Sequence, residues 1–468
     1  MQLKFIEGAV KHAKSLPMAI RPAGRKFRTA LGAAIAAVAL DAMCGPLAAE
    51  TATTAVQPFA EFVQDLSTAP ANAFVGLPVA AVSDETAFEE MRRHLINLYG
   101  GMAVSHSFAR GGQVLDCVPI LQQPAVRLQG LKEIAEPPPR TPAASWMAET
   151  LEDVSSALPQ QGQAEQCEDG TVPMRRITLD QVARFKTLQH FLGKGPDGAG
   201  YAPAVILPSV ILSDGSSHAH VGERQYVKNY GGYSVINVWQ PGVYTDAPYN
   251  EELSLAQQWY IGAPGTSNEQ TAEVGWQVYP AYYGDSLPHL FTYWTADLYA
   301  TTGCYNTDCG AFVTTSSTDT PGEAFSPVST YGGTQYDIGL GFYLYKGNWW
   351  LAFRHTNSWI GYYPGSLYVG GQLSRFAQVI QFGGETATQG YWPFMGSGAK
   401  GAPGYGYQAY QERIIYRDSK NVGHTPSLLS YTDTHNKCYL TSTTPAAGGT
   451  GWGTYFYFGG PGGKPGAC

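Results

Sequence analysis

The chain has 468 residues and a formal net charge of −8, with only 14% charged residues, 13% aromatic residues and 55 glycines. This length accommodates two or three domains, and the lack of a basic excess argues against nucleic acid as a partner. Charged residues become sparser after about residue 200. We therefore expect a domain boundary there.

The N-terminal residues have the pattern of an export signal. Basic residues at 21–28 precede an apolar stretch at 29–40, and small residues lead to a cleavage site after Ala49. The apolar stretch is too short to span a bilayer as a mature helix. We expect residues 1–49 to be a signal peptide and the mature protein to be secreted, extracellular or periplasmic, and free of the membrane.

Helical patterns are confined to the region before residue 200. Apolar residues at helical spacing predict a helix over 84–97 and a second one over 179–192. Their apolar stripes are formed by Phe88, Met91, Leu95 and Leu98, and by Val182, Phe185, Leu188 and Phe191. The glycine-rich stretch 193–200 is expected to be a flexible, exposed link that proteases can cut.

Residues 203–468 have the pattern of an all-β domain. Short runs of Tyr, Trp, Val, Ile and Thr alternate with Gly, Pro, Asn and Asp. Strands separated by turns are typical of such a composition.

Two glutamates lie in segments of this domain that otherwise look like buried strands. Alternation places Glu273 on one strand face with Gln277, and Glu385 on one face with Gln381. Acidic residues are depleted in strands and are rarely buried without a partner. Two carboxylates in one cleft cannot both ionise freely, so one can act as an acid and the other as a base. Such a pair can hydrolyse a bond with an activated water and without a metal.

Spacing alone favours a simpler interpretation, in which Glu273 and Glu385 are half-exposed, solvated and without function. The sequence His218-Ala-His220 presents two imidazoles on one strand face as candidate metal ligands. Because no third ligand is evident, a surface loop or strand is the preferred interpretation there, and we expect no metal or cofactor. No Gly-x-Ser-x-Gly elbow indicates a serine nucleophile.

Cysteine usage indicates disulfides. Six cysteines remain after Cys44 is removed with the signal peptide, and an even number in an exported chain favours disulfide bonding. Six cysteines allow fifteen pairings, which the sequence leaves open. Proximity and the domain division favour three pairs, Cys117–Cys167, Cys304–Cys309 and Cys438–Cys468.

Several ordered segments carry a family resemblance. Residues 112–125 and 167–176 look like two motifs of an activation peptide, and residues 230–239, 291–297 and 451–461 look like strands of the same family. On these segments the chain resembles the neprosin family of glutamic prolyl endopeptidases.

The resemblance implies an all-β fold, an antiparallel two-sheet β-sandwich of the glutamic-peptidase or concanavalin-like type, preceded by a small α+β pro-domain. Residues 50–202 would be a pro-segment that is removed at acidic pH and acts as an intramolecular inhibitor. Residues 203–468 would be the catalytic domain. By analogy with fungal glutamic peptidases, Glu385 would be the base that activates water, and protonated Glu273 the acid.

We therefore expect a secreted zymogen whose partners are proline-containing peptides or proteins, cleaved after proline at acidic pH. The expected substrate-binding residues are Gln277, Trp276, Gln381, Tyr293 and Trp294. The alternative is a carbohydrate-binding or glycoside-hydrolysing β-sandwich, since paired carboxylates also serve glycoside hydrolysis. A third possibility, a non-catalytic adhesion sandwich, predicts that the two glutamates lie far apart or exposed.

Overall fold

The computed structural model of the chain describes residues 56–77, 79–139, 165–194, 218–243, 252–354, 358–388, 390–401, 404–432, 437–441, 446–447 and 451–464. All of these belong to one compact unit, residues 55–468. The expected signal peptide, the expected domain boundary at 202/203 and Cys468 lie outside the described residues.

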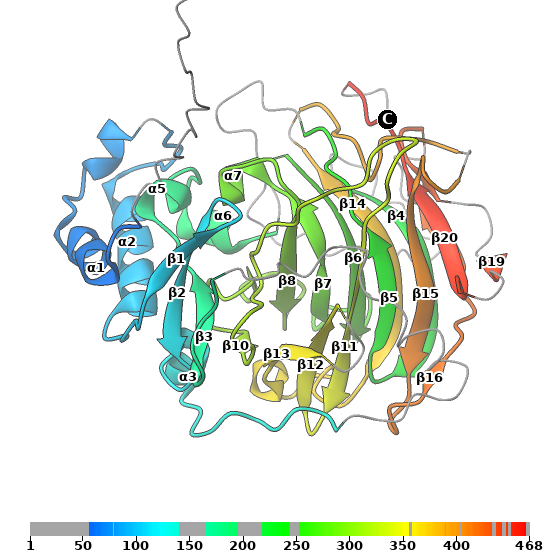
Figure 1. Cartoon of the computed structure of the whole chain (residues 1–468), viewed down its shortest axis with the longest axis horizontal. Helices are drawn as coiled ribbons and strands as arrows, with labels where there is room; N and C mark the ends of the chain where they lie inside the picture. The colour runs from blue at the N-terminus through cyan, green and yellow to red at the C-terminus, as the bar shows by residue number, and fades with distance from the viewer. Residues whose placement is uncertain are drawn as a thin grey trace, which may run out of the picture. The chain divides into compact units, whose positions relative to one another are not determined.

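The described strands form three sheets, and every pairing between them is antiparallel (Figure 1). The two larger sheets pack against each other through a shared apolar core, and the third sheet is small. The predicted fold class, an antiparallel β-sandwich preceded by a small α+β region, is confirmed.

The N-terminal region combines helices with the small sheet. Its helices are α1 (Phe59–Thr68), η1 (Ala73–Gly76), α2 (Glu85–Tyr99), α3 (Pro124–Gln129), α5 (Leu179–Val182) and α6 (Leu188–Leu192). Its three-stranded sheet has the order β1 (Ser107–Arg110), β2 (Gln113–Pro119) and β3 (Thr171–Arg175).

Helix α2 matches the predicted helix over 84–97. The carboxylate of Asp84 caps its first turn by accepting a hydrogen bond from the backbone N–H of Ala87 at 2.9 Å. All four residues of its predicted apolar stripe are buried. Apolar spacing was sufficient to predict this helix.

The prediction of one helix over 179–192 is wrong, because two short helices occupy this stretch. Thr178 caps α5 in a capping box with Gln181. Thr187 caps α6, accepting a hydrogen bond from the backbone N–H of His190 at 3.2 Å. A threonine whose side chain binds the backbone in this way starts a new helix, and periodicity does not reveal such a break.

The larger sheet of the sandwich has ten strands. Its order is β10 (Val313–Thr314), β13 (Trp359–Tyr363), β12 (Asn348–Phe353), β11 (Asp337–Tyr345), β5 (Gly232–Asn237), β15 (Ala409–Arg417), β20 (Thr454–Gly459) and β18 (Leu440–Thr441), with β16 (Gly423–His424) on β15 and β19 (Ala446–Ala447) on β20.

The second sheet has seven strands and carries both glutamates. Its order is β17 (Leu429–Thr432), β4 (His218–Asn229), β14 (Ala377–Ala387), β6 (Leu253–Gly262), β7 (Gln270–Val278), β8 (His289–Thr295) and β9 (Cys304–Tyr305). The short helices α7 (Pro280–Tyr283) and η2 (Gly365–Tyr368) connect strands.

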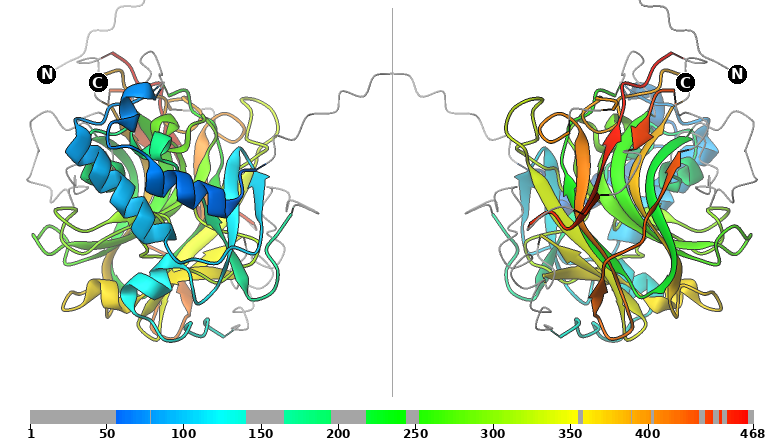
Figure 2. Two further views of the ribbon diagram at one scale, coloured as in Figure 1. Left: turned by 90° about the vertical axis from the view of Figure 1, so that its left-hand side faces the viewer. Right: turned by 90° about the vertical axis from the view of Figure 1, so that its right-hand side faces the viewer.

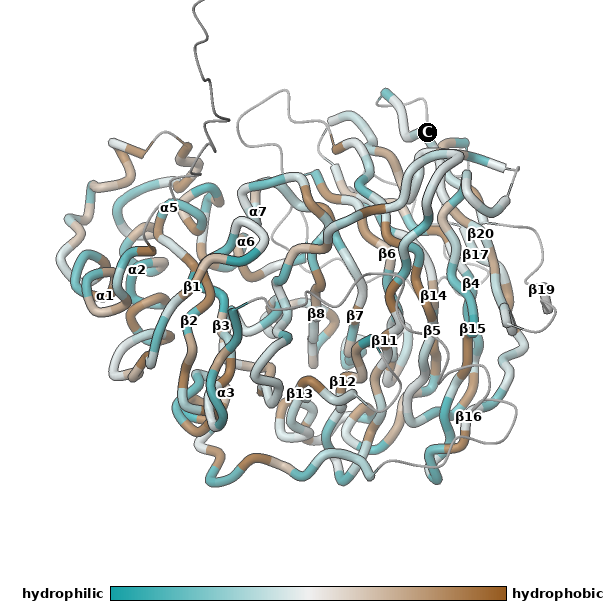
Figure 3. The backbone as a smooth tube through the Cα atoms, viewed as in Figure 1, coloured by the Kyte–Doolittle hydropathy of each residue, from teal (hydrophilic) through white to brown (hydrophobic). Residues whose placement is uncertain are grey.

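The seven-stranded sheet is covered on both faces. One face contributes Val274, Trp276 and Val278 to the core between the two sheets. The other contributes Leu255 and Tyr293 to a cluster that includes the apolar stripe of α2. In the left view of Figure 2 the helices of the N-terminal region stand in front of the sheets. Hydrophobic and hydrophilic residues follow one another along the strands in Figure 3.

Glycines beside the two glutamates permit close packing of the strands. A Cβ atom on Gly275 would lie 1.9 Å from the carbonyl oxygen of Ala256, and one on Gly383 would lie 2.3 Å from that of Val221. Neither distance is possible, so both positions require glycine. The glycines in these segments therefore serve the approach of neighbouring strands.

The structure contains the disulfides Cys117–Cys167 and Cys304–Cys309, two of the three expected pairs. Cys438 is also disulfide-bonded. Within the described ranges, none of the helices is both long and apolar enough to cross a bilayer.

A buried ion pair joins the small sheet to the sandwich. The Arg175 guanidinium lies 2.8 Å from the Asp308 carboxylate, and both side chains are fully buried. Removing one partner of a buried pair leaves the other charge uncompensated. We expect Arg175→Ala to lower the free energy of unfolding by about 3–5 kcal/mol, measured by denaturant titration.

The matched control is Arg93→Ala, because Arg93 is 62% exposed and lies 3.8 Å from Glu89. Loss of this surface pair is expected to cost less than about 1 kcal/mol. Equal effects of the two substitutions would contradict the structural role of Arg175.

Candidate active site

The two glutamates lie on strands separated by β6 alone. Glu273 in β7 is opposite Trp259 of β6, and Glu385 in β14 is opposite Leu255 of the same strand. Gln257 lies between these two positions on β6, and alternation places its side chain on the same face. The sheet therefore brings together two residues that are more than a hundred positions apart in the sequence.

A lysine from the N-terminal region joins the two carboxylates. Nζ of Lys194 lies 2.6 Å from Oε2 of Glu273 and 2.7 Å from Oε2 of Glu385. The side chains of these three residues are at most 1% exposed. Because both carboxylates bind one ammonium, they lie well within about 10 Å of each other. The adhesion alternative predicts separated or exposed glutamates, and the observed proximity and burial differ from that prediction.

The prediction that residues 193–200 form an exposed link is wrong for its first two residues. Gly193 and Lys194 are buried, and residues 195–200 lie outside the described residues. A lysine is rarely buried unless it is paired, and the partners of Lys194 come from two distant strands. No local pattern in a glycine-rich segment predicts such a pairing.

Glu273 has further polar partners on its own side of the site. The hydroxyl of Tyr299 donates to Oε1 of Glu273 at 2.5 Å, and the hydroxyl of Thr271 donates to the same oxygen at 2.8 Å. Together with Lys194, these contacts satisfy both oxygens of the buried carboxylate.

Glu385 is held on both of its oxygens. The side-chain amide of Gln257 donates to Oε2 at 2.7 Å, the oxygen that also binds Lys194. On the other side, Nδ1 of His218 lies 2.7 Å from Oε1, and Nε2 of His220 lies 3.6 Å from it. The carboxylate is therefore fixed in orientation by four side chains.

The electrostatics of the pair follow from burial and from these contacts. Burial raises the pKa of the Glu385 carboxyl, but the Lys194 ammonium and the two histidines outweigh it and hold this pKa well below its usual range. Burial lowers the pKa of Lys194, but the two glutamates raise it above its ordinary value. Lys194 is thus a charged side chain whose stability in the interior depends on Glu273 and Glu385.

Three predicted substrate-binding residues lie on the face of the sheet that carries the glutamates, and all three are buried. Tyr293 of β8 is directly opposite Glu273, and its hydroxyl donates to the backbone oxygen of Leu192 at 3.3 Å. The side-chain amide of Gln277 donates to the Tyr283 hydroxyl at 3.1 Å. Gln381 lies opposite Trp259.

The two predicted tryptophans lie elsewhere. Trp276 and Trp294 belong to the core between the sheets, and Trp276 donates to the backbone oxygen of Asn237 at 3.0 Å. Trp276 is three positions from Glu273, and Trp294 is one position from Tyr293, the cross-strand partner of Glu273. An odd spacing along a strand places a side chain on the opposite face, so both tryptophans face away from the glutamates. Their location does not support a role in substrate binding.

Sequence reasoning missed Lys194, Gln257 and Tyr299, which contact the glutamates directly. It considered His218 and His220 only as metal ligands without a third partner. The structure supplies that partner, because ligand atoms of His218, His220 and Glu385 all lie within 4.8 Å of one another. The alternation of His218-Ala-His220 was the one sequence signal that pointed to this cluster.

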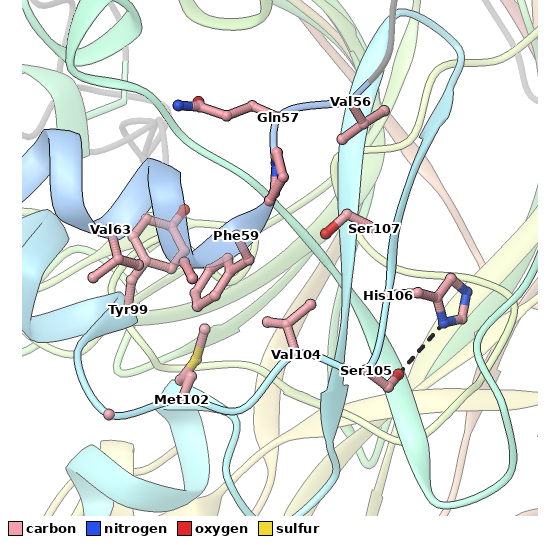
Figure 4. Close-up of a pocket in the computed structure, with 13 residues that line it drawn as sticks. Val56, Gln57, Phe59, Val63, Tyr99, Met102, Val104, Ser105, His106 and Ser107 are labelled. Carbon is pink, nitrogen blue, oxygen red and sulfur yellow. Dashed lines mark hydrogen bonds between the residues drawn. The ribbon is translucent and has the colours of Figure 1, made fainter.

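A cavity of about 620 Å³ lies in the N-terminal region (Figure 4). It is lined by residues 56–60, 63, 99, 101–102 and 104–107, among them Phe59, Tyr99 and Met102. Its lining includes none of Glu273, Glu385 and Lys194, so this cavity is not the candidate active site.

Comparisons with known proteins found similar solved structures and one matching family model. A structure of SCP-B, a member of the eqolisin family of peptidases, in complex with the tripeptide Ala-Ile-His, is 9% identical, covers 52% of this chain and 97% of its own, and has a TM-score of 0.28. CG-16, a homodimeric agglutinin from chicken liver, is 9% identical to this chain and has a TM-score of 0.18. The match covers 36% of this chain and 94% of the agglutinin. The family model named Neprosin matches residues 250–461, which contain both glutamates. This match supports a glutamic-type peptidase at the level of the family, and it identifies residues 250–461 of the chain as a Neprosin domain.

Proposed function

We propose that this chain is the zymogen of a secreted glutamic endopeptidase that cuts peptide bonds after proline at acidic pH. In this proposal residues 1–49 are the signal peptide, residues 50–202 the pro-segment and residues 203–468 the catalytic domain. The observation that carries it is the buried pair Glu273 and Glu385, joined by one lysine on the covered face of the seven-stranded sheet.

The proposed chemistry uses the two carboxyl groups in different protonation states. Ionised Glu385 accepts a proton from water as the oxygen attacks the carbonyl carbon of the peptide bond. Protonated Glu273 donates to the carbonyl oxygen as negative charge develops on it. The carbon–nitrogen bond then breaks, and the amine leaves with the proton held by the carboxyl pair. Catalysis by a carboxyl pair in which one member must be protonated is expected to be fastest at acidic pH.

The proposed latency follows from the position of Lys194. Its ammonium occupies the space between the carboxylates, where the water and the scissile bond would have to lie. It also neutralises charge on both groups. We propose that the pro-segment inhibits by this direct occupation of the catalytic pair.

Acid is proposed to loosen the pro-segment. Its cation Arg175 is paired with Asp308 of the catalytic domain, and its cation Lys194 is paired with the catalytic glutamates. A carboxylate that binds a proton no longer pairs with a cation, so protonation of these groups would weaken the attachment of the pro-segment. Because the pKa of Glu385 is held well below its usual range, its pair with Lys194 is expected to be lost only in acid strong enough to protonate this group.

The test is to incubate the purified full chain at about pH 3–5 with a proline-containing peptide and to follow both by mass spectrometry. We expect cleavage after proline together with loss of roughly 150 N-terminal residues, about the size of a small domain. The same peptide with alanine in place of proline is the control and is expected to remain intact. An uncut proline peptide beside a trimmed, folded protein would favour the carbohydrate alternative.

A further inference from the structure

We infer that His218, His220 and Glu385 form a binding site for a divalent transition metal, with zinc as the ion that fits best. The site deepens the proposed function, because a metal on Oε1 of Glu385 would draw electron density from the carboxylate that activates water in that proposal. Metal binding itself does not depend on that proposal.

The fold places the three side chains together by strand register. His218 and His220 are two positions apart on β4, so their side chains lie on the same face. Glu385 of β14 is directly opposite His220 in the antiparallel pairing. Directly opposite residues have neighbouring side chains, and the two imidazole rings are parallel to within 11°.

The spacing of the ligand atoms suits zinc. Nδ1 of His218 and Nε2 of His220 lie 2.7 Å and 3.6 Å from Oε1 of Glu385. Ligand atoms around a tetrahedral zinc are roughly 3.3 Å apart, as follows from metal–ligand bonds of about 2.0 Å. These two separations bracket this value, and all three ligand atoms lie within 4.8 Å of one another, so small rotations of the side chains would bring them around one ion.

The surroundings orient the carboxylate toward the histidines. Gln257 and Lys194 both bind Oε2 of Glu385, which leaves Oε1 directed at the two imidazoles. A neutral outer contact such as that of Gln257 fixes a ligand and strengthens a metal site, whereas the positive charge of Lys194 opposes a second cation. All three proposed ligands are at most 7% exposed, so competition from water is small.

The ligand set selects the class of metal. Two imidazoles and one carboxylate are typical of zinc, whereas calcium and magnesium prefer oxygen ligands alone. Zinc on Oε1 would make the Glu385 carboxylate a weaker base for the proton of water. The ion is therefore expected to inhibit a glutamic peptidase and not to serve its chemistry.

The experiment is a titration of the full chain with Zn²⁺ alone at about pH 7.5, where imidazole ligands are deprotonated, followed by calorimetry and by thermal unfolding. We expect one zinc ion per chain and a rise in melting temperature. His218→Ala and His220→Ala should each weaken binding by at least about tenfold. The absence of stoichiometric binding by the wild-type chain would overturn the site.

Two further variants guard against effects of misfolding. His424→Ala is the matched control, because His424 lies 3.0 Å from the Asp418 carboxylate in a pair without a second histidine, and binding should be unchanged. Lys194→Met removes a positive charge next to the metal position and should bind zinc more tightly. Tighter binding cannot result from loss of the fold, and unchanged or weaker binding would contradict the location.

Peptide cleavage separates this inference from the proposed function. At about pH 5, between the ordinary pKa values of carboxyl and imidazole groups, chelator should leave proline-directed cleavage unchanged. Activity that required zinc would overturn the inhibitory assignment. Stoichiometric zinc binding without any peptide cleavage would refute the proposed function and leave the metal site standing.

Discussion

Glu385→Gln is expected to abolish both conversion of the full chain and cleavage of a proline peptide, with a rate loss of roughly 10²–10⁴-fold. The amide has nearly the same shape as the carboxylate but cannot accept a proton from water. Glu273→Gln should also reduce the rate strongly, because an amide cannot transfer a proton to the developing oxyanion or to the leaving amine. Initial rates at about pH 4, with product masses, are the measurement.

Glu412→Gln is the matched control for these variants. Glu412 is also a buried strand glutamate, but it lies in the ten-stranded sheet, and burial raises its pKa to about 8. A group with this pKa is already neutral at acidic pH, so a neutral amide should preserve both fold and activity. Normal cleavage by Glu385→Gln, in a protein that unfolds like the wild type, would exclude the two-carboxyl mechanism.

Lys194→Met is expected to give a full-length chain that cleaves peptide before its N-terminal region is removed. A charged hydrogen bond in the interior contributes about 1.5–3 kcal/mol, and every 1.4 kcal/mol corresponds to tenfold. The rate of cleavage by the unprocessed chain should therefore rise roughly ten- to a hundredfold. The measurement is the initial rate at a pH where the wild-type chain remains unprocessed, with chain length followed by mass spectrometry.

Lys186→Met tests whether this effect is specific. Lys186 belongs to the same segment but is exposed, so its substitution should leave latency intact. Lys194→Gln provides a second substitution at the key position in case methionine disturbs packing. Wild-type latency in both Lys194 variants, together with wild-type stability, would show that occupation of the glutamate pair by lysine is not what inhibits the chain.

Local patterns predicted the features that depend on neighbours in the sequence. Helix α2 followed from apolar spacing, and its bounds agree with the expected range because Asp84 provides a cap close to the apolar stripe. Helices α5 and α6 were predicted as one, because Thr187 interrupts the helix through a side-chain contact with the backbone that periodicity does not register. The disulfides Cys117–Cys167 and Cys304–Cys309 agreed with pairing by proximity within each region.

The sequence by itself determined the class of fold and singled out Glu273 and Glu385, because alternation and the rarity of strand carboxylates are properties of short segments. Only the tertiary structure decided what surrounds them. Lys194, Gln257 and His218 meet the two glutamates through strand order and register, which depend on the packing of the whole sheet. The same packing turned Trp276 and Trp294 into the core. A charge buried in a glycine-rich link becomes predictable only when its partners on distant strands are known.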